Sequence, residues 1–378
     1  MSDVPPLRFP EFSGEWKSCY IKDILSIGNG RDYKHLSKGN IPVFGTGGYM
    51  TSVNDYLHDG ETTFIGRKGT INKPFYYNGK FWTVDTLFYT HSFIDTIPRF
   101  IYCLFQTINW LRYNEASGVP SLSKDTIEKI KVCIPNLEEQ AKIATLLRLI
   151  DERIVTQNKI IDKLQSLIKG LVDSLLENPS WEKVYLRSFM QFYSTNSLSW
   201  EQLSYSNGNV RNLHYGLIHG FQTSMIDSTL LPRILPNYLP KQYTVCQDGD
   251  VVFADASENT NEIGKAIEFS NTIDVKTVCG LHTIHGRDIK QNTILGFKGF
   301  AFNSRYFHDQ VRRLAQGTKV YSITAKNLSS CYVYIPDMIK QENVVRLLNV
   351  YEENLSLNRT LLNKYEIQKQ YLLQQMLI

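Results

Sequence analysis

The stretch that decides the fold is PNLEEQAKIATLLRLIDERIVTQNKIIDKLQSLIKGLVDSLLE, residues 135–177. A second stretch, PDMIKQENVVRLLNVYEENLSLNRTLLNKYEIQKQYLLQQMLI, occupies residues 336–378. A shift of 201 residues lays the first on the second without a gap, so that Pro135 falls on Pro336 and Gln140 falls on Gln341. Two related segments at a fixed offset predict a chain built from one unit repeated twice.

Apolar side chains recur in both stretches at alternating spacings of four and three residues, which is the pattern of a coiled-coil seam. In the first stretch the seam is Ile143, Leu147, Ile150, Ile154, Gln157, Ile161, Leu164, Ile168, Leu171 and Leu175. In the second it is Val344, Leu348, Tyr351, Leu355, Asn358, Leu362, Tyr365, Lys369, Leu372 and Met376. A solvated helix with a casual apolar stripe is the alternative, but unbroken heptads in both stretches favour two packed helices.

An amide interrupts each seam near its middle, Gln157 in the first and Asn358 in the second. A polar residue at such a position lowers stability but fixes the register of the helices. In an antiparallel pair the middle of one seam faces the middle of the other. We therefore expect Gln157 and Asn358 to lie in one layer of an antiparallel helix pair.

The repeat continues upstream of the helices. E-W-K-S-C-Y-I-K-D-I, residues 15–24, is similar to S-W-E-K-V-Y-L-R-S-F, residues 180–189. Just before each helix come a small-residue turn and a short strand, with Ser123 in the first copy and Thr324 in the second as the expected N-caps of a short helix. The framework of the unit is thus predicted to be the same in both halves.

The predicted fold class is α+β: two mixed α/β domains separated by two long helices that pack as an antiparallel coiled coil, with pseudo-twofold symmetry. The first domain is expected to include an amphipathic, core-packing helix from Ile97 to Tyr113. Runs such as ETTFIG, PFYY, FWTV, GDVVFA and KAIEF are typical of short strands. The expected segments are a first domain (1–135), a central spacer helix with its linker (136–180), a second domain (181–335) and a C-terminal spacer helix (336–378).

Composition sets the class of protein. Hydrophobic residues make up 42% of the chain and charged residues 21%, which is ordinary for domains with real cores. The net charge is +4, and the basic excess lies in the domains rather than in the helices. This distribution fits a surface that faces phosphates, although so small an excess also fits chance.

The six cysteines are far apart and form no C-x-x-C, which argues against a zinc site and against a disulfide framework. A reducing cytoplasm is therefore the expected compartment. The first residues lack the apolar core of a signal peptide, and no apolar run approaches the eighteen or so residues of a membrane span.

Two Gly-rich stretches carry all but one of the binding candidates of the first domain. In I-P-V-F-G-T-G-G-Y, residues 41–49, the glycines are not followed by a helix, so we expect a tight turn that lets the backbone approach a partner, not a nucleotide loop. In F-I-G-R-K-G-T-I-N-K-P-F, residues 64–75, cations on a turn suit phosphate contact or base readout, and a solvated hairpin is equally compatible. The candidates in this domain are Lys34, Thr46, Tyr49, Arg67, Lys68 and Lys73.

The second domain offers polar loops. Asn259 and Asn261 suit base or phosphate contacts, and a plain surface turn is equally compatible. Three histidines invite a metal site, but their spacing with no placed carboxylate is not a known ligand pattern. The DNA-binding candidates in this domain are His219, Asn259, Asn261, Lys265, His282 and Arg287.

No catalytic motif stands out in the chain. The sequence contains no G-x-x-x-x-G-K-[ST], no G-x-S-x-G, no Asn/Asp-Pro-Pro-aromatic motif of amino-methyltransferases and no nuclease-type acidic cluster. We therefore expect a chain that binds without catalysing, with no metal and no cofactor of its own.

Several of these motifs together resemble the specificity (S) subunit of type I restriction-modification enzymes, over essentially the whole chain. The residues that carry the resemblance are P-x-L-R-F-P-E-F at 5–12 followed by Trp16, S-G-V-P-S-L-S-K at 117–124, I-P-x-L-x-E-Q-x-K-I-A at 134–144, G-D-V-V-F-A-D-A-S-E at 249–258 and G-L-H-T-I at 280–284. Two departures are Ile-Lys-Gln at 339–341, where the first copy has Glu-Glu-Gln, and Asn72 in G-T-I-N-K, where a Gly is often seen.

The resemblance implies a function. Each domain would read one half of a bipartite sequence in double-stranded DNA, and the helices would set the spacing and dock two methyltransferase (M) subunits. Motor-nuclease (R) subunits would join for cleavage, and S-adenosylmethionine, ATP and Mg would bind to the partner subunits. The rival hypotheses are a scaffold whose domains bind peptides or sugars on a helical stalk, and an enzyme with an unrecognised active site.

Overall fold

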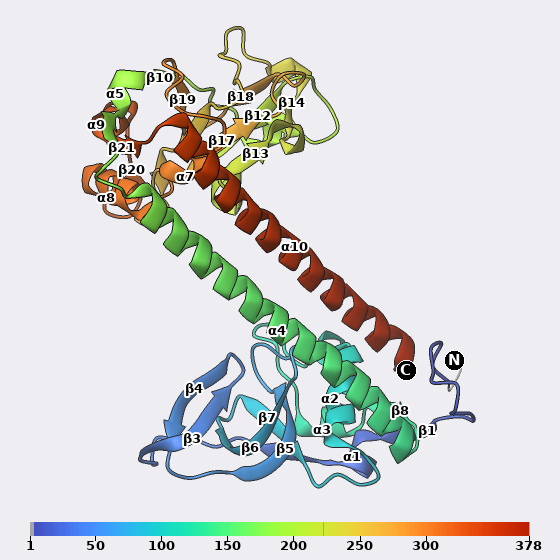
Figure 1. The fold of residues 1–378 in the computed structure, drawn as a ribbon. Coiled ribbons are helices and arrows are strands. Elements are labelled where there is room, and N and C mark those ends of the chain that lie inside the picture. The colour runs from blue at the N-terminus through green and yellow to red at the C-terminus, as the bar shows by residue number, and fades with distance from the viewer. Residues whose placement is uncertain (1–3, 222, 378) are drawn as a thin grey trace. The chain divides into compact units, whose positions relative to one another are not determined.

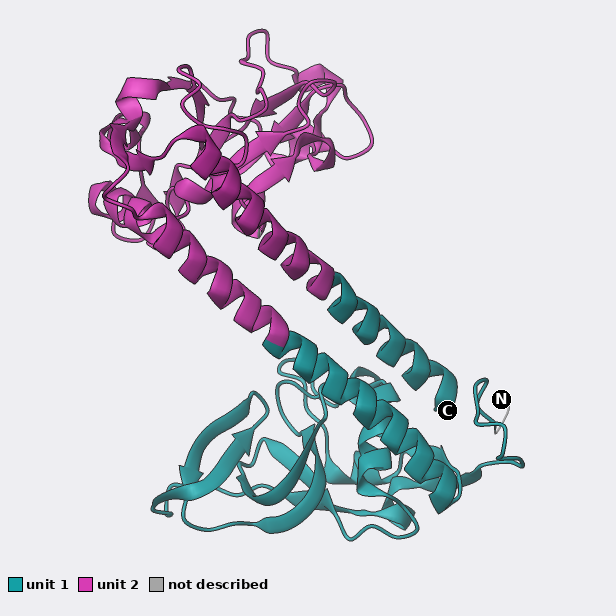
Figure 2. Ribbon diagram, in the orientation of Figure 1, with its two compact units in different colours: residues 1–159, 360–378 teal, residues 160–359 magenta. Residues whose placement is uncertain are grey.

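The computed structural model describes residues 4–221 and 223–377 (Figure 1). The chain divides into two compact units (Figure 2). The first unit holds residues 1–159 and 360–378, and the second holds residues 160–359. Each unit therefore combines one globular domain with part of both long helices.

Two long helices confirm the two predicted helical stretches: α4 (Leu137–Leu176) and α10 (Met338–Met376). Asn136 caps the first, because its Oδ1 accepts a hydrogen bond from a first-turn backbone N–H at 2.9 Å. Asp337 caps the second in the same way, also at 2.9 Å. Such caps satisfy N–H groups that the first turn leaves unpaired.

Among the described residues, no helix is long and apolar enough to cross a membrane.

The predicted seam faces inward along both helices, since all of its positions are buried or half-buried. In the first unit, Asp151 on α4 pairs with Lys369 on α10 at 2.7 Å, and Arg153 lies over the ring of Tyr365. The later residue of α4 thus meets the earlier residue of α10, so the helices run antiparallel. In the second unit, the last turns of α4 and the first turns of α10 share one hydrophobic core, as an antiparallel pair requires.

The two seam amides fall in different units, so their shared layer stays a prediction. Gln157 belongs to the first unit and is only 5% exposed. Asn358 belongs to the second unit, where its Nδ2 donates to the backbone carbonyl of Asn354 on its own helix at 2.8 Å.

The globular part of the first unit is a six-stranded sheet with the order β2-β7-β5-β6-β3-β4. Helix α2 (Pro98–Thr107) packs against β5, and its buried side chains join the core that the start of α4 also enters. The strands are β2 (Ser26–Asn29), β3 (Lys38–Gly45), β4 (Gly48–Val53), β5 (His58–Gly66), β6 (Phe75–Thr83) and β7 (Leu87–His91).

Two local expectations need correction. The helix predicted from Ile97 to Tyr113 is two helices, α2 and the short 3-10 helix η1 (Trp110–Tyr113), because the backbone leaves the helical conformation at Ile108 and Asn109. The runs PFYY and FWTV form one strand, β6, because the Asn–Gly between them interrupts the apolar pattern but not the pairing with β5.

The globular part of the second unit has two main sheets. One has the order β10-β19-β15-β17-β13, and the other has the order β11-β14-β12-β18. The strands are β10 (Met190–Tyr193), β11 (Leu203–Ser204), β12 (Arg211–Leu213), β13 (Met225–Asp227), β14 (Arg233–Ile234), β15 (Val251–Ala254), β17 (Ala266–Ser270), β18 (Thr277–Cys279) and β19 (Thr283–Asp288). The helices are α5 (Leu186–Phe189), α6 (Tyr215–Gly220), α7 (Phe297–Ala301) and α8 (Arg305–Leu314).

The edges of both domains repeat, as the sequence predicts. Strand β1 (Lys17–Tyr20) pairs antiparallel with β8 (Lys131–Ile134), and β9 (Glu182–Tyr185) pairs antiparallel with β21 (Tyr332–Ile335). The short helices before β8 and β21 are α3 (Lys124–Glu128) and α9 (Ala325–Ser330). Ser123 and Thr324 cap them by accepting from backbone N–H groups, which confirms both N-cap predictions.

A buried glutamine ties each long helix to its domain in the same way. The amide of Gln140 accepts from the N–H of Ile97 at 3.0 Å and donates to two backbone carbonyls. The amide of Gln341 accepts from the N–H of Ile294 at 3.0 Å and also donates to two backbone carbonyls. Both glutamines are at most 1% exposed. The repeat therefore extends from sequence to individual hydrogen bonds.

The departure at residues 339–341 has a structural explanation. Glu139 is fully buried and receives two hydrogen bonds from the Arg8 guanidinium, each 2.7 Å long. At the equivalent position of the second unit, Lys340 is exposed and pairs with Asp337. The first unit needs an acid here because its N-terminal segment crosses the start of α4, and the second unit has no such requirement.

Candidate nucleic-acid interface

The basic loop of the first unit follows β5 directly and lies beside the S-G-V-P-S segment, residues 117–121. The N–H of Leu122 donates to the carbonyl of Arg67 at 2.9 Å, and Lys68 forms an isolated bridge with Ser121. Gly69 has a φ of +91°, which favours glycine. Arg67, Lys68 and Lys73 are all exposed on this loop, so their cations are available to a ligand.

The turn between β3 and β4 approaches the same loop. A Cβ on Gly69 would lie 3.7 Å from the hydroxyl oxygen of Thr46, which places that turn next to the basic loop. Tyr49, just after the turn, is 63% exposed and its hydroxyl lies 3.0 Å from that of Ser52. Lys34 is exposed in the connection between β2 and β3.

In the second unit, the structure brings His219 and Lys265 together around one carboxylate. Glu262 lies 3.3 Å from the Nδ1 of His219 and 3.6 Å from the Nζ of Lys265. Lys265 also donates to the backbone carbonyls of His219 and Phe221. Asn259 and Asn261 are exposed on the loop that leads into Glu262, so four of the predicted residues share one surface region.

His282 occupies a constrained position between β18 and β19. Its φ is +55°, which is uncommon for a residue with a side chain. Its Nδ1 lies 3.3 Å from the Oδ1 of Asp255, and its ring lies perpendicular to that of Tyr215 at a centroid distance of 5.3 Å. No local sequence pattern marks Asp255 as a partner of His282, because 27 residues separate the two.

Arg287 has a structural partner in the second unit. Its guanidinium donates to both carboxylate oxygens of Asp250, at 2.8 and 2.7 Å, and His285 lies 2.7 Å from the same carboxylate. Burial acts to raise the pKa of Asp250, but the hydrogen bonds from Arg287 and His285 outweigh it and the pKa is lowered. Contact between Arg287 and DNA stays a prediction, and its ion pair gives it a second role in the fold.

Three possible metal ligands that are far apart in the sequence, Cys246, Cys279 and His285, lie close together in the structure. The sulfur atoms of Cys246 and Cys279 lie 3.5 Å apart, and one ring nitrogen of His285 is within 4.8 Å of both. Burial raises the pKa of the Cys279 thiol well above its usual value. Four ligands are the rule for a structural zinc site, and the described residues supply three. The expected absence of a metal therefore stays a prediction.

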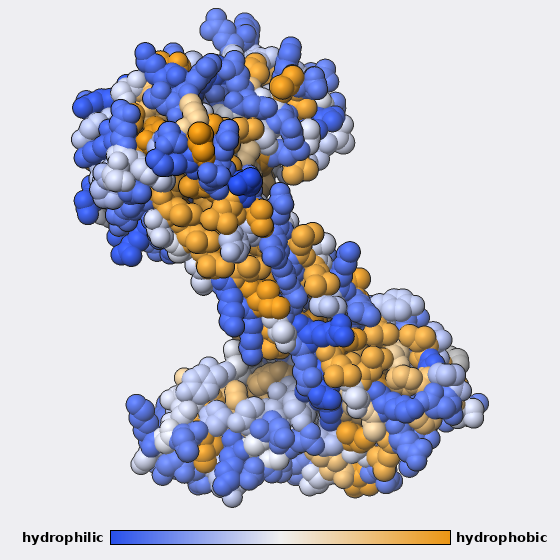
Figure 3. Space-filling view, viewed as in Figure 1, coloured by the Kyte–Doolittle hydropathy of each residue, from blue (hydrophilic) through white to orange (hydrophobic). Residues whose placement is uncertain are grey.

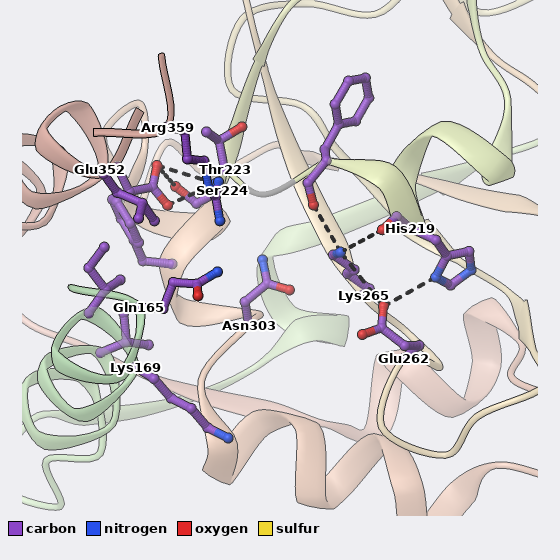
Figure 4. A pocket seen from close by; sticks show the side chains of 15 residues that line it. Gln165, Lys169, His219, Thr223, Ser224, Glu262, Lys265, Asn303, Glu352 and Arg359 are labelled. Carbon is purple, nitrogen blue, oxygen red and sulfur yellow. Dashed lines mark hydrogen bonds and ion pairs between the residues drawn. The ribbon is translucent and has the colours of Figure 1, made fainter. Parts of the chain in front are cut away.

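A cavity of about 430 Å³ lies within the second unit where α4 and α10 meet the globular domain (Figure 4). On one side Glu352 accepts hydrogen bonds from the backbone and hydroxyl of Ser224, and burial raises the pKa of its carboxyl group. On the other side Figure 4 shows Lys265 with Glu262 and His219. The cavity thus borders the surface region that holds four of the predicted residues.

A cavity of about 540 Å³ occupies the equivalent place in the first unit. Its α10 lining is Glu366, Lys369, Gln370 and Leu373, and a shift of 201 residues carries Gln165, Ile168, Lys169 and Val172 of the second-unit cavity onto them. The same shift carries Asp151 and Ile154 onto Glu352 and Leu355. The repeat has therefore produced one cavity per unit, built from matching helix positions.

Comparisons with known proteins agree with this architecture. Residues 13–166 match the family model described as the type I restriction modification DNA specificity domain. The chain is 24% identical over 323 residues to the type I restriction enzyme MjaVIII specificity subunit of Methanocaldococcus jannaschii, an alignment that covers 81% of this chain and 72% of the relative. It is 26% identical over 157 residues to the type I restriction enzyme EcoprrI specificity subunit of Escherichia coli, covering 37% of each.

Solved structures show the same fold. The S subunit of a type I restriction-modification system from M. genitalium superposes with a TM-score of 0.64 at 13% identity, covering 99% of both chains. A chain from a study of complex assembly and conformational transition of the type I restriction-modification system gives a TM-score of 0.58 at 14% identity, covering 98% of this chain and 97% of the other. In sequence and in fold, the chain is therefore similar to the specificity subunits of type I restriction-modification systems over most of its length.

Proposed function

We propose that this chain is the DNA sequence-recognition subunit of a type I restriction-modification complex and that it catalyses no reaction itself. One observation carries the proposal: the two units share their framework down to the bonds of Gln140 and Gln341, while the loops that this framework presents differ. A repeated framework with different loops suits a ligand that is approximately twofold but whose two halves have different sequences. A bipartite DNA site has this property.

The contacts of the first unit support DNA as the ligand. Arg67, Lys68 and Lys73 are exposed on one glycine-containing loop beside an exposed second loop. Such cations neutralise phosphates, and an arginine fork also matches the O6 and N7 edge of guanine. The second unit offers Asn259, Asn261 and His219, whose polar side chains suit base edges.

Methyltransferase subunits are the proposed partners of the helices, one for each half of the repeat. The two equivalent cavities support a partner present in two copies, because matching positions can receive the same segment twice. Exposed apolar side chains on α10, among them Val350, Leu357 and Ile367, supply further docking area. On the face drawn in Figure 3, hydrophobic residues are visible along the two helices. Motor-nuclease subunits would then join this assembly, and S-adenosylmethionine, ATP and Mg would act in the partner subunits.

The proposal is tested by producing the chain together with its methyltransferase partner and mapping every methylated site in the host genome. We expect a single bipartite sequence with a fixed spacer. Replacing residues 181–335 with those of a related chain should change one half of that sequence and leave the other half intact. Duplex binding should also weaken steeply with salt. A complex with no sequence preference would contradict the proposal, and so would methylation or cleavage by the purified chain alone.

A further inference from the structure

Arg67 and Asp255 occupy the same position in the two units. In the first unit the last pair of β5 and β7 is Gly66 with Leu87, and Arg67 follows. In the second unit the last pair of β15 and β19 is Ala254 with Thr283, and Asp255 follows. The two positions therefore match by strand register.

The backbone hydrogen bonds of the two residues match as well. The carbonyl of Arg67 accepts from the N–H of Leu122 at 2.9 Å, and the carbonyl of Asp255 accepts from the N–H of Ile323 at 2.9 Å. Leu122 and Ile323 are themselves 201 residues apart. The N–H of Arg67 donates to Thr86, and the N–H of Asp255 donates to His282, in the turns that precede β7 and β19. The same framework thus presents a cation in one unit and a carboxylate in the other.

The carboxylate of Asp255 contacts His282 but keeps unused capacity to accept hydrogen bonds. Its side chain is 30% exposed, and its Oδ1 is turned inward, buried, toward the Nδ1 of His282 at 3.3 Å. That oxygen has no hydrogen bond of good geometry in the described structure. His282 is itself 51% exposed and is steadied by the edge of Tyr215. The arrangement directs one oxygen toward His282 and leaves Oδ2 as the acceptor that can face a ligand.

An acid at this position restricts what the ligand can offer. Phosphates repel a carboxylate, so Asp255 cannot take the phosphate-binding role that is open to Arg67. In the major groove a carboxylate can accept only from an exocyclic amino group, which is N4 of cytosine or N6 of adenine. Guanine O6 and N7 and thymine O4 are acceptors and leave the carboxylate without a donor.

Resting on the proposed function, we propose that Asp255, positioned by His282, reads a base amino group in the half-site of the second unit, at the place where the first unit presents Arg67. Asp255 is then a specificity-determining residue, and His282 is a positioning residue that holds the carboxylate in one orientation. The polar loop with Asn259 and Asn261 continues directly from this position and is exposed beside it.

The experiment uses the full chain with its methyltransferase partner and a library of duplexes in which each half-site is randomised in turn. Asp255→Asn and Asp255→Ala are compared with the wild type. Asp274→Asn, an exposed acid of the same domain, is the matched control. At one base pair of the second half-site, we expect Asp255→Ala to reduce discrimination about 5- to 150-fold. Asp255→Asn keeps an acceptor and adds a donor, so it should also admit guanine or thymine there.

His282→Ala should weaken discrimination at the same base pair, and His282→Gln, which retains a hydrogen-bonding side chain, should restore part of it. A merely structural defect would instead lower binding to all sequences alike, with a lower unfolding temperature. Unchanged preference in folded Asp255→Asn and Asp255→Ala would overturn the inference and leave the proposed function standing. A wild-type complex without any preference would overturn the proposed function and the inference with it.

Discussion

The residue that follows β5 in the first unit is an exposed arginine, and its counterpart after β15 in the second unit is a half-buried aspartate. The backbone around Arg67 and Asp255 makes the same bonds in both units. By contrast, Gln140 and Gln341 are identical in residue type, burial and partners. The difference separates two classes of position in the repeat.

Positions of the first class are buried, and their polar atoms bond to main chain that the rest of the domain fixes. A change there leaves a buried donor or acceptor without a partner, which costs about 1–3 kcal/mol. Positions of the second class keep the backbone hydrogen bonds and expose at least part of the side chain, so the residue type can change without breaking a bond of the framework. Specificity can therefore diverge between the units while the helix attachment stays the same.

Lengthening both helices should have the largest effect, because it changes the spacing between the two half-sites while the loops of both units stay the same. Seven residues inserted after Lys159 and seven before Thr360 preserve the seam and add about 10 Å to the pair. Both units keep their loops, so both half-sequences should be retained with a spacer longer by about three base pairs. Methylation of the original site should be lost. An insertion into α4 alone breaks the register and serves as the control, and an unchanged spacer in genome-wide methylation maps would refute the role of the helices in spacing.

Blocking the cavities one at a time tests whether the units are equivalent in docking. Lys169→Trp fills the cavity of the second unit and Gln370→Trp fills that of the first, from exposed positions that are 201 residues apart. Each should reduce the methyltransferase subunits per chain from two to one, and the double variant should bind none. Light scattering of the purified complex measures this ratio. Tryptophan at Lys163 or Lys364, matched positions outside the cavities, should leave the ratio at two.

Substitution of Arg287 tests whether this residue has a structural role or a DNA-contacting role in the second unit. Arg287→Met leaves the carboxylate of Asp250, whose side chain is 2% exposed, without its bidentate partner. Breaking a buried pair in this way should cost about 3–5 kcal/mol in the free energy of unfolding, measured with denaturant. Arg313→Met, an exposed arginine of the same domain, should change it by about 0.5 kcal/mol or less. A stable variant with weakened DNA binding would place Arg287 at the interface instead.

The pH dependence of stability tests the same ion pair between Asp250 and Arg287. Because the pKa of Asp250 is lowered in the folded protein, its contribution to stability is present above the unfolded pKa and is lost as pH falls through the folded one. Arg287→Met removes the main hydrogen-bond donor that lowers this pKa. The variant should therefore lose less stability than the wild type on acidification through that range.

The sequence predicts those features of the fold that depend on neighbouring residues. The structure confirms three such periodic or local signals. They are the seam spacing, the N-caps Ser123 and Thr324, and the 201-residue offset between the two halves. The apolar pattern does not reveal the break after Thr107, because it continues into Trp110, whose indole N–H donates to the carbonyl of Phe105.

The site was only partly predictable, because its contacts join distant parts of the chain. Asp255 contacts His282, which lies in the turn between β18 and β19. His282 has a positive φ in this turn, and no sequence pattern predicts a positive φ at a histidine. Cys246, Cys279 and His285 converge from three separate strands or loops. Composition and loop position did select Arg67 and Lys68 as exposed cations, because glycine turns and surface charge are visible in sequence.

Gln140→Leu and Gln341→Leu test the identity of the two attachments most directly. Each removes an acceptor from one backbone N–H, of Ile97 or Ile294, and a donor from two backbone carbonyls, so each should cost about 1–3 kcal/mol in the free energy of unfolding. Because the bonds match, the two losses should agree to within about 0.5 kcal/mol and should add in the double variant. Gln368→Leu, on the exposed face of α10, is the control and should be near neutral. If one loss is much larger, the framework is shared in geometry but not in energy, and the unit with the smaller loss has a second attachment that compensates.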